Sequence, residues 1–225
     1  MSTTATQRRA YAPRVPAEER REQLLDAALE LLAGEGHGAL TIDAVAREVG
    51  VARPVVYRLF GDRAGLLEAL FRREDARAMS QVAAAIPEIP GDQHPDDLLV
   101  DGLRLFLEAV RESPLTWRLV LIDLDRAPEE MRTAIARRRE IVRRQLERLV
   151  AWGVERRGGP EGLDSELFAG MIQVIAEHAA TLVITDPERY PVERFLDFTK
   201  TMLAAIEQGM GSTDLPPPKL DLEAR

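Results

Sequence analysis

Residues 41–60 read TIDAVAREVGVARPVVYRLF, and the rest of the chain is organised around them. Ile42 and Val45 begin an apolar pattern with the three- and four-residue spacing of a short helix, which is expected to stop by Gly50 because glycine readily adopts a positive φ. Pro54 is tolerated only in the first turn of a helix, so a second helix is expected to begin within a residue or two of it. Two short helices across a tight turn predict a helix-turn-helix.

The second of these helices is predicted to expose a face that suits the major groove of DNA. Val56, Leu59 and Phe60 form its expected buried side. The exposed side then carries Arg53, Pro54, Val55, Tyr57 and Arg58. Guanidinium groups bond guanine edges, an aliphatic group contacts a thymine methyl and a phenol reaches a phosphate, so this combination favours DNA recognition.

With EERREQLLDAALELLAGEGHGALT before it and GDRAGLLEALF after it, this stretch resembles the DNA-binding domain of the TetR/AcrR family of transcriptional regulators. The resemblance runs without a gap from about Glu19 to Phe71 and includes the run T-x-x-x-x-A-x-x-x-G-V, the pair Tyr57 and Phe60, and the basic Arg63. It implies an all-α protein in which a three-helix head is joined by a linking helix to a helical body. The head would bind double-stranded operator DNA.

The expected division of labour in the head follows from residue chemistry. Arg53, Val55 and Arg58 are expected to read bases, and Thr41, Tyr57 and Arg63 to hold phosphates. Two alternatives stay open: Tyr57 packs its ring inside the head, and Thr41 caps its own helix in addition to any phosphate contact. The family usually has Ser or Thr before the recognition helix, where this chain has Ala52, and such a cap is worth about 1 kcal/mol.

The charge distribution is compatible with DNA binding despite a net charge of −8 and a pI of about 5.1. Residues 1–72 hold ten arginines and ten acidic residues, so the whole excess of negative charge lies on the rest of the chain. A neutral head with arginines on one side binds phosphate, while an acidic body keeps the protein off random DNA.

Composition and periodicity divide the chain into four parts. Residues 1–16 are predicted to be a disordered arm whose arginines, Arg8, Arg9 and Arg14, either reach a minor groove or belong to a solvated tail. With the resemblance, residues 17–61 are expected to form the DNA-binding domain, 62–210 the ligand-sensing and dimerisation domain, and 211–225 a disordered tail. About nine helices are expected in total. Outside residues 41–60 they span approximately 17–33, 62–85, 96–112, 114–124, 128–156, 164–184 and 192–210.

The last two helices predict a homodimer. Apolar residues cover most of the circumference of 164–184, so that helix must be buried on more than one side. The family resemblance implies that the last two helices pair with their copies as a four-helix bundle. Val174 and Phe198 are our expected interface positions.

The body is expected to sense a small molecule. Large apolar side chains that border the expected cavity are Phe106, Trp117, Leu121, Trp152 and Met171, with Arg104, Gln173, Glu177 and His178 as polar groups that orient a ligand. Ordinary core packing is the alternative for each. The arginine-rich helix 128–156 is interpreted as a solvated, charge-laced face, with a pocket for an anionic ligand as the alternative.

Other classes of protein find little support in the sequence. It has no G-x-S-x-G, P-loop or H-E-x-x-H motif, and its three histidines lie far apart, so we expect neither an enzyme nor a metal or cofactor site. Absence of cysteine fits the cytoplasm, and no uninterrupted apolar run approaches the roughly 18 residues of a membrane span.

The resulting hypothesis is a homodimeric, ligand-responsive transcriptional regulator. We expect a repressor that binds a palindromic operator and is released by a small molecule held in the body. Two alternatives stay open: an architectural or division-control protein that binds DNA on the same scaffold without a ligand, and an enzyme hidden in the body.

Overall fold

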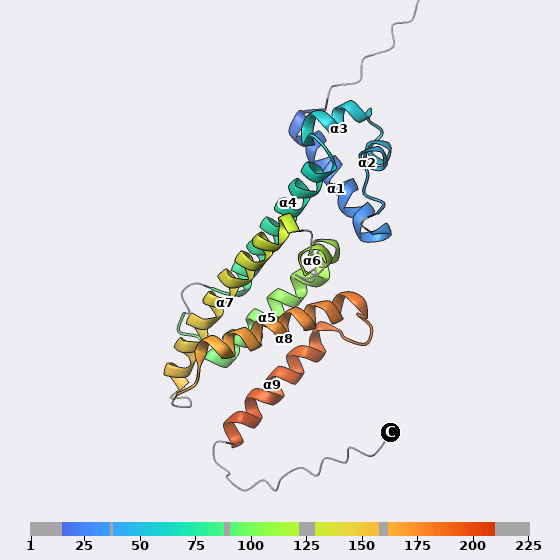
Figure 1. The fold of residues 1–225 in the computed structure, drawn as a ribbon. Coiled ribbons are helices and arrows are strands. Elements are labelled where there is room, and N and C mark those ends of the chain that lie inside the picture. Colours follow the sequence, from blue (N-terminus) through green and yellow to red (C-terminus); the bar gives the residue numbers. More distant parts are fainter. Residues whose placement is uncertain (1–14, 37, 88–90, 122–128, 158–161, 210–225) are drawn as a thin grey trace, which may run out of the picture. The chain divides into compact units, whose positions relative to one another are not determined.

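The computed structural model describes residues 15–36, 38–87, 91–121, 129–157 and 162–209. Within these ranges every regular element is an α-helix. The helices are α1 (Ala17–Glu35), α2 (Ile42–Val49), α3 (Arg53–Phe60), α4 (Arg63–Ala85), α5 (Pro95–Glu112), α6 (Pro114–Val120), α7 (Glu129–Arg157), α8 (Ser165–Thr185) and α9 (Val192–Gly209) (Figure 1). The all-α prediction is therefore confirmed. The expected N-terminal arm with Arg8, Arg9 and Arg14 and the expected tail 211–225 lie outside the described residues.

Local capping explains where several helices begin and end. The Thr41 side chain accepts a hydrogen bond from the Ala44 N–H at 3.1 Å, so Thr41 does cap α2. Gly50 ends α2 with φ 71°, in the left-handed region. Asp62 and Asp164 accept from N–H groups at the starts of α4 and α8 at 2.8 and 3.0 Å. The ends of these helices are thus set by residues that satisfy the orphan N–H and C=O groups.

His94 caps α5, a role that the sequence analysis did not anticipate. Its Nδ1 accepts from the Asp96 N–H at 3.3 Å. As expected, no side chain caps α3, because Ala52 stands at that position.

The chain divides into two compact units, residues 1–73 and 74–225, and the boundary falls inside α4. In the first unit α1 packs on α2 and α2 on α3 (Figure 1). Leu24, Val45, Val56, Leu66 and Leu70 are fully buried and form its core. The amphipathic pattern of these short helices thus buries one side of each and leaves the other side of α3 exposed. The sequence predicts the boundary between the domains at residues 61 and 62, in the turn before α4, and this boundary stays a proposal.

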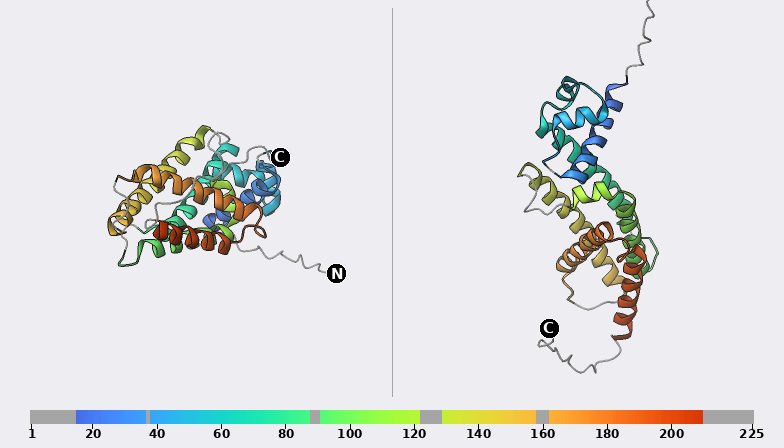
Figure 2. Two further views of the ribbon diagram at one scale, coloured as in Figure 1. Left: turned by 90° about the horizontal axis from the view of Figure 1, so that it is seen from below. Right: turned by 90° about the vertical axis from the view of Figure 1, so that its right-hand side faces the viewer.

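The second unit contains the remainder of α4 and helices α5 to α9. Helix α7 packs against α8, and α5 packs against both α8 and α9 (Figure 2). Its apolar core includes Leu107, Val110, Trp117, Val120 and Ala180. These side chains come from three helices, α5, α6 and α8, and the core extends to the C-terminal part of α4, where Ala78 is fully buried.

Buried polar groups attach α4 to α6 and α7 within this unit. Glu74 is fully buried and accepts a hydrogen bond from the Thr116 hydroxyl at 2.6 Å. Arg138, which is 8% exposed, donates to Asp75 at 2.5 Å and to the Val120 carbonyl at 2.6 Å. The burial of Arg138 differs from the solvated face expected for the arginines of α7. A buried charge is tolerated because it is paired and hydrogen-bonded.

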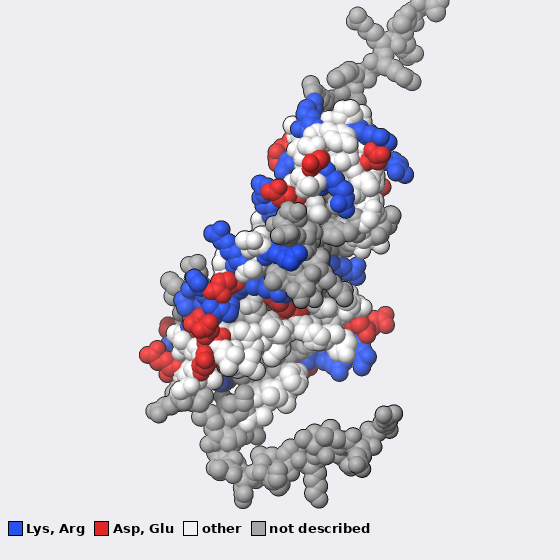
Figure 3. Space-filling view, in the orientation of Figure 1, with Lys and Arg blue, Asp and Glu red and all other residues white. Residues whose placement is uncertain are grey.

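One side of α8 and α9 leaves large apolar side chains exposed. They are Leu167, Phe168, Met171, Val174, Ile175, Phe198 and Met202. Much of the surface over α8 lacks charged side chains (Figure 3). By length and composition alone α8 is apolar enough to cross a membrane, although a core helix of a soluble protein passes the same test. Glu166 and Glu177 interrupt its apolar run, which is why the sequence did not predict a span.

Candidate nucleic-acid interface and effector cavity

Helix α3 presents an exposed polar and basic face in the first unit. Arg53, Pro54, Tyr57 and Arg58 are exposed and Val55 is half-buried, whereas Val56 and Phe60 are buried on the opposite side. Tyr57 is 50% exposed, which argues against the alternative of a ring packed inside the head. The five residues expected on this face therefore share it. Basic and acidic side chains are interspersed on the visible surface of this unit (Figure 3).

An ion pair holds the first residue of α3. Arg53 Nε lies 2.6 Å from Asp43 Oδ1 of α2, and both side chains remain largely exposed. The contact joins the two helices of the helix-turn-helix at the point where α3 has no side-chain cap. The sequence analysis did not foresee it.

Thr41 and Arg63, the two other residues expected to contact DNA, also make contacts within the head. Thr41 is exposed while its hydroxyl caps α2, so its outer side stays accessible. Arg63 Nε donates to the Leu40 carbonyl at 2.6 Å, which ties the start of α4 to the segment before α2. Arg63 is thus partly committed to the structure of the head. On the inner side, Arg21 lies 4.8 Å from the centroid of the Phe60 ring.

The second unit contains an apolar cavity of about 280 Å³. Helices α4, α5, α6, α7 and α8 and one residue of α9 contribute its walls. Phe106 and Trp117 meet edge to face there, with ring centroids 5.1 Å apart. A cavity of this size lies near the lower end of ligand pockets, which range over roughly 300–1,000 Å³.

Six of the nine residues expected at a ligand site line this cavity. They are Phe106, Trp117, Leu121, Trp152, Gln173 and Glu177. Arg104, Met171 and His178 do not line it, and this corrects the expectation for those three. Met171 is 53% exposed and His178 is exposed as well, because both point away from the walls that α8 contributes. Arg104 pairs instead with Asp101 at 3.4 Å.

Apart from Trp152, sequence reasoning missed the residues of α7 that line the cavity. Val142, Leu146 and Leu149 line it together with Arg138 and Arg139. An arginine-rich helix is usually a solvated one, so its pattern did not indicate which arginines turn inward. The apolar residues between the arginines were the available signal.

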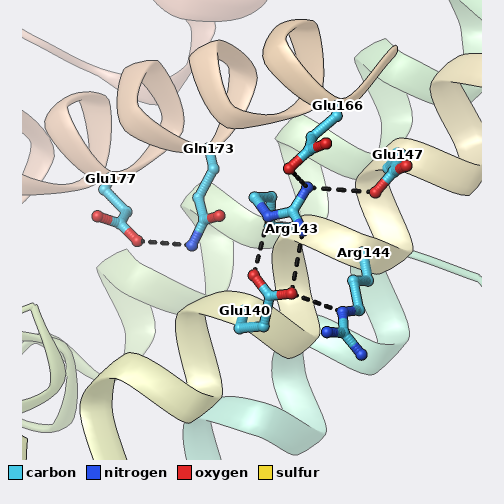
Figure 4. Close-up of polar contacts among 7 residues, drawn as sticks. All are labelled: Glu140, Arg143, Arg144, Glu147, Glu166, Gln173 and Glu177. Atoms are coloured by element: carbon cyan, nitrogen blue, oxygen red, sulfur yellow. Dashed lines mark hydrogen bonds and ion pairs between the residues drawn. The ribbon is translucent and has the colours of Figure 1, made fainter.

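At one side of the cavity a polar group of three residues links α7 to α8. Arg139 Nη2 donates to Glu177 at 2.9 Å, and Gln173 Nε2 donates to the same carboxylate at 3.1 Å. Figure 4 shows Gln173 and Glu177 on successive turns of α8. Among the described residues, the buried Nε of Arg139 has no hydrogen-bond partner.

A second charged group of α7 lies outside the cavity and holds α8 by an ion pair (Figure 4). Arg143 contacts Glu140 at 2.9 Å, Glu147 at 3.2 Å and, across to α8, Glu166 at 3.2 Å. Hydrogen bonds from Arg143 and then Arg144 lower the pKa of Glu140 to about 2. The hydrogen bond to Glu140 raises the pKa of Arg143. Among the described residues no group of three or more metal-ligating side chains is placed to hold a metal ion.

Comparison with known proteins places the fold. The family model described as "Bacterial regulatory proteins, tetR family" matches residues 24–70. A helix-turn-helix transcriptional regulator of Mycobacterium tuberculosis is 27% identical over 189 residues, which cover 83% of this chain and 76% of that protein. The transcriptional activator FasR of Mycolicibacterium smegmatis is 37% identical over 73 residues, 32% of this chain and 33% of that protein.

Solved structures agree over most of the length. A TetR-like transcriptional regulator from Rhodococcus superposes with a TM-score of 0.65 at 25% identity, over 87% of this chain and 100% of that one. FadR of Bacillus subtilis, in complex with stearoyl-CoA, superposes with a TM-score of 0.63 at 19% identity, over 84% of this chain and 98% of that one. At 19% identity the likeness shows the fold alone.

In the described ranges the chain is all-helical and exposes one side of α3 in a helix-turn-helix unit, and the family match and relatives make it a transcriptional regulator rather than an enzyme. Residues 24–70 carry the DNA-binding domain of the TetR family of bacterial transcriptional regulators, and the relatives and solved structures that the chain resembles are regulators of this type. Members of this family bind operator DNA and dimerise, and some bind small-molecule ligands.

Proposed function

We propose that this protein is a homodimeric, cytoplasmic repressor that binds a palindromic operator and is released from it by a small molecule in the second unit. The observation that carries the proposal is the pairing of two features in one chain. An exposed α3 face suits the major groove, and an apolar cavity with a few polar groups suits a ligand.

At the operator, Arg53, Val55 and Arg58 would contact base edges, with Pro54 at the start of the recognition helix. Thr41, Tyr57 and Arg63 would contact phosphates and set the orientation of the head. The exposure of Arg53 and Tyr57 supports these roles. Arg53 would exchange its carboxylate partner Asp43 for a guanine edge, so the ion pair keeps the guanidinium near the groove before binding.

Dimerisation through α8 and α9 would bury the apolar side chains that one chain leaves exposed. Obligate interfaces commonly bury on the order of 2,000 Å² or more and are apolar. A two-fold dimer presents two recognition helices to successive major grooves, about 34–36 Å apart. A small change in the spacing of the heads would therefore weaken operator binding.

The route from cavity to head would run through α4. Arg138 lines the cavity and also bonds to Asp75 of α4, and α4 continues without a break from Arg63 to Ala85. A ligand that favours one position of Arg138 would bias the position of α4. Such coupling typically amounts to about 1–3 kcal/mol, or roughly 5- to 150-fold in operator affinity.

The experiment has two stages. Full-length protein selects its binding sites from a random-sequence DNA library, and the recovered site then drives a reporter gene with and without the protein. We expect a palindrome and lower expression when the protein is present. Recovery of no preferred sequence would contradict the proposal, and higher expression with the protein present would make it an activator.

An architectural or division-control protein without a ligand is the competing function. The cavity supports a ligand-sensing body over this alternative, since a body without a ligand gains nothing from an apolar void of this size. Operator binding that no cavity ligand alters would favour the competing function.

A further inference from the structure

The cavity walls are almost wholly hydrocarbon. Val82, Leu103, Phe106, Leu146 and Trp152 contribute apolar surface from three different helices, α4, α5 and α7. Such walls gain free energy by removing apolar ligand surface from water. The bulk of any occupant is therefore hydrocarbon.

The charged residues among the cavity walls all have opposite charges as partners. Arg138 pairs with Asp75 at 2.5 Å, Arg139 with Glu177 at 2.9 Å, and Arg157 with Asp96. An ionised head group would meet no surplus of opposite charge here. Bringing a net charge into apolar surroundings is costly unless it is paired, so the walls favour an uncharged ligand.

One of the lining residues, Arg139, carries a donor that has no acceptor among the described residues. The buried Nε of Arg139 makes no hydrogen bond among the described residues, and buried donors are rarely left in that state. Glu177 lies on the same guanidinium and would repel a second carboxylate. A neutral acceptor oxygen satisfies the donor without that repulsion.

We propose that the occupant of this cavity is an uncharged, mainly hydrocarbon molecule with one acceptor oxygen, such as an ester, ketone or alcohol, which accepts from Arg139 beside Gln173. This inference rests on the proposed role of the cavity as the effector site. It excludes ligands whose binding depends on a carboxylate, a phosphate or a quaternary ammonium group.

Intrinsic fluorescence reports occupancy directly, since the chain has two tryptophans and both Trp117 and Trp152 line the cavity. The full-length protein is titrated with methyl decanoate, decanoate, decyl phosphate and decyltrimethylammonium below their micelle concentrations. We expect the neutral ester to bind about tenfold tighter than any of the three ions, a difference of about 1.4 kcal/mol.

Three variants locate the site. Arg139→Lys keeps a positive charge beside Glu177 but removes the Nε donor, and it should weaken ester binding about tenfold. Ala176→Phe fills the cavity and should abolish the fluorescence change, whereas Ala151→Phe, on the exposed side of α7, should leave it intact. Circular dichroism checks that each variant is folded. If a variant unfolds, the order of the affinities of the four ligands for the parent protein tests the proposal instead.

The outcomes separate this inference from the proposed function. If one of the three ions binds most tightly, or if no probe changes the fluorescence, the proposed ligand class is wrong. The proposal that the protein binds an operator is unaffected by either result. Ester binding that leaves operator affinity unchanged would support the ligand class and refute control of the head by the cavity.

Discussion

Asp43 Oδ1 lies 2.6 Å from Arg53 Nε, and under our proposal this ion pair positions the guanidinium before DNA binds. We predict that Arg53→Ala removes discrimination at one base pair per half-site and costs about 1–3 kcal/mol of operator affinity. Fluorescence anisotropy with the selected operator and with single-base variants measures this effect. If Arg53→Ala discriminates between the operator and its single-base variants as well as the parent does, Arg53 does not contact a base.

Arg63→Ala is the matched comparison for a phosphate contact, and it should weaken all sequences alike. Arg63 also donates a hydrogen bond to the Leu40 carbonyl, so the substitution can destabilise the head. The thermal stability of the Arg63→Ala variant must therefore be measured together with its operator affinity. A sequence-dependent loss with Arg63→Ala would reverse the assignment of the two arginines.

Gly65 carries a requirement that the sequence pattern does not reveal. A Cβ at this position would collide with the backbone oxygen of Phe60. We predict that Gly65→Ala destabilises the protein by about 1–3 kcal/mol, the usual cost of overpacking. Gly34→Ala on α1 meets nothing within 4 Å and should instead gain about 0.5–1 kcal/mol from lower backbone entropy in the unfolded chain. Urea unfolding of the two variants compares them, and equal effects would contradict the collision.

At the scale of elements, two ion pairs join α7 to α8. Arg139 and Glu177 form one at the cavity, and Arg143 and Glu166 form the other outside it. Glu140 belongs to the outer group and has a pKa of about 2, below the 4.5 of a free glutamate. Its contribution to stability is therefore present above pH 4.5 and is lost as the pH falls from 4.5 towards 2.

We predict that Glu140→Gln flattens the fall in unfolding free energy over this acidic range and leaves the profile near neutrality parallel to that of the parent. Glu155→Gln, an exposed carboxylate on the same helix, is the control. Chemical denaturation at a series of pH values supplies the measurement. Parallel acid profiles for the parent and Glu140→Gln would show that this group does not couple to folding.

At the scale of the whole molecule, the exposed apolar side of α8 and α9 predicts assembly. Val174 and Phe198 are 66% and 64% exposed in one chain. Val174→Glu should yield monomers or insoluble protein, because a charge would be buried without a partner. Ala151→Glu, which adds the same charge on the exposed side of α7, should leave the dimer intact. Sedimentation of the parent as a stable monomer at micromolar concentration would defeat the prediction.

Ligand and operator must affect each other equally if the cavity controls the heads. Once a cavity ligand is known, its affinity for the free dimer and for the operator-bound dimer should differ by the factor by which it weakens operator binding. Isothermal calorimetry measures both affinities. Equal ligand affinities in the two states would mean that the body does not control the head.

The sequence by itself determined the local part of this structure. Thr41, Gly50, Pro54 and Asp62 act through neighbours within a few residues, so their effects on the helices could be predicted from spacing alone. The helix-turn-helix, the exposed side of α3 and the approximate ends of the helices follow from these residues. Four of the expected residues that line the cavity, Phe106, Trp117, Leu121 and Trp152, were predicted because large apolar side chains recur on the inner sides of amphipathic helices.

Only the tertiary structure decided which polar side chains meet. Arg138 and Asp75 are 63 positions apart, and Arg139 and Glu177 are 38 apart. No periodicity relates residues at such separations, so an arginine-rich helix gave no sign of which guanidinium turns inward. The same holds for Gly65, whose need for a missing side chain arises from the path of the backbone around Phe60. Helix periodicity specifies which side of an element is buried, but packing between elements specifies the partner.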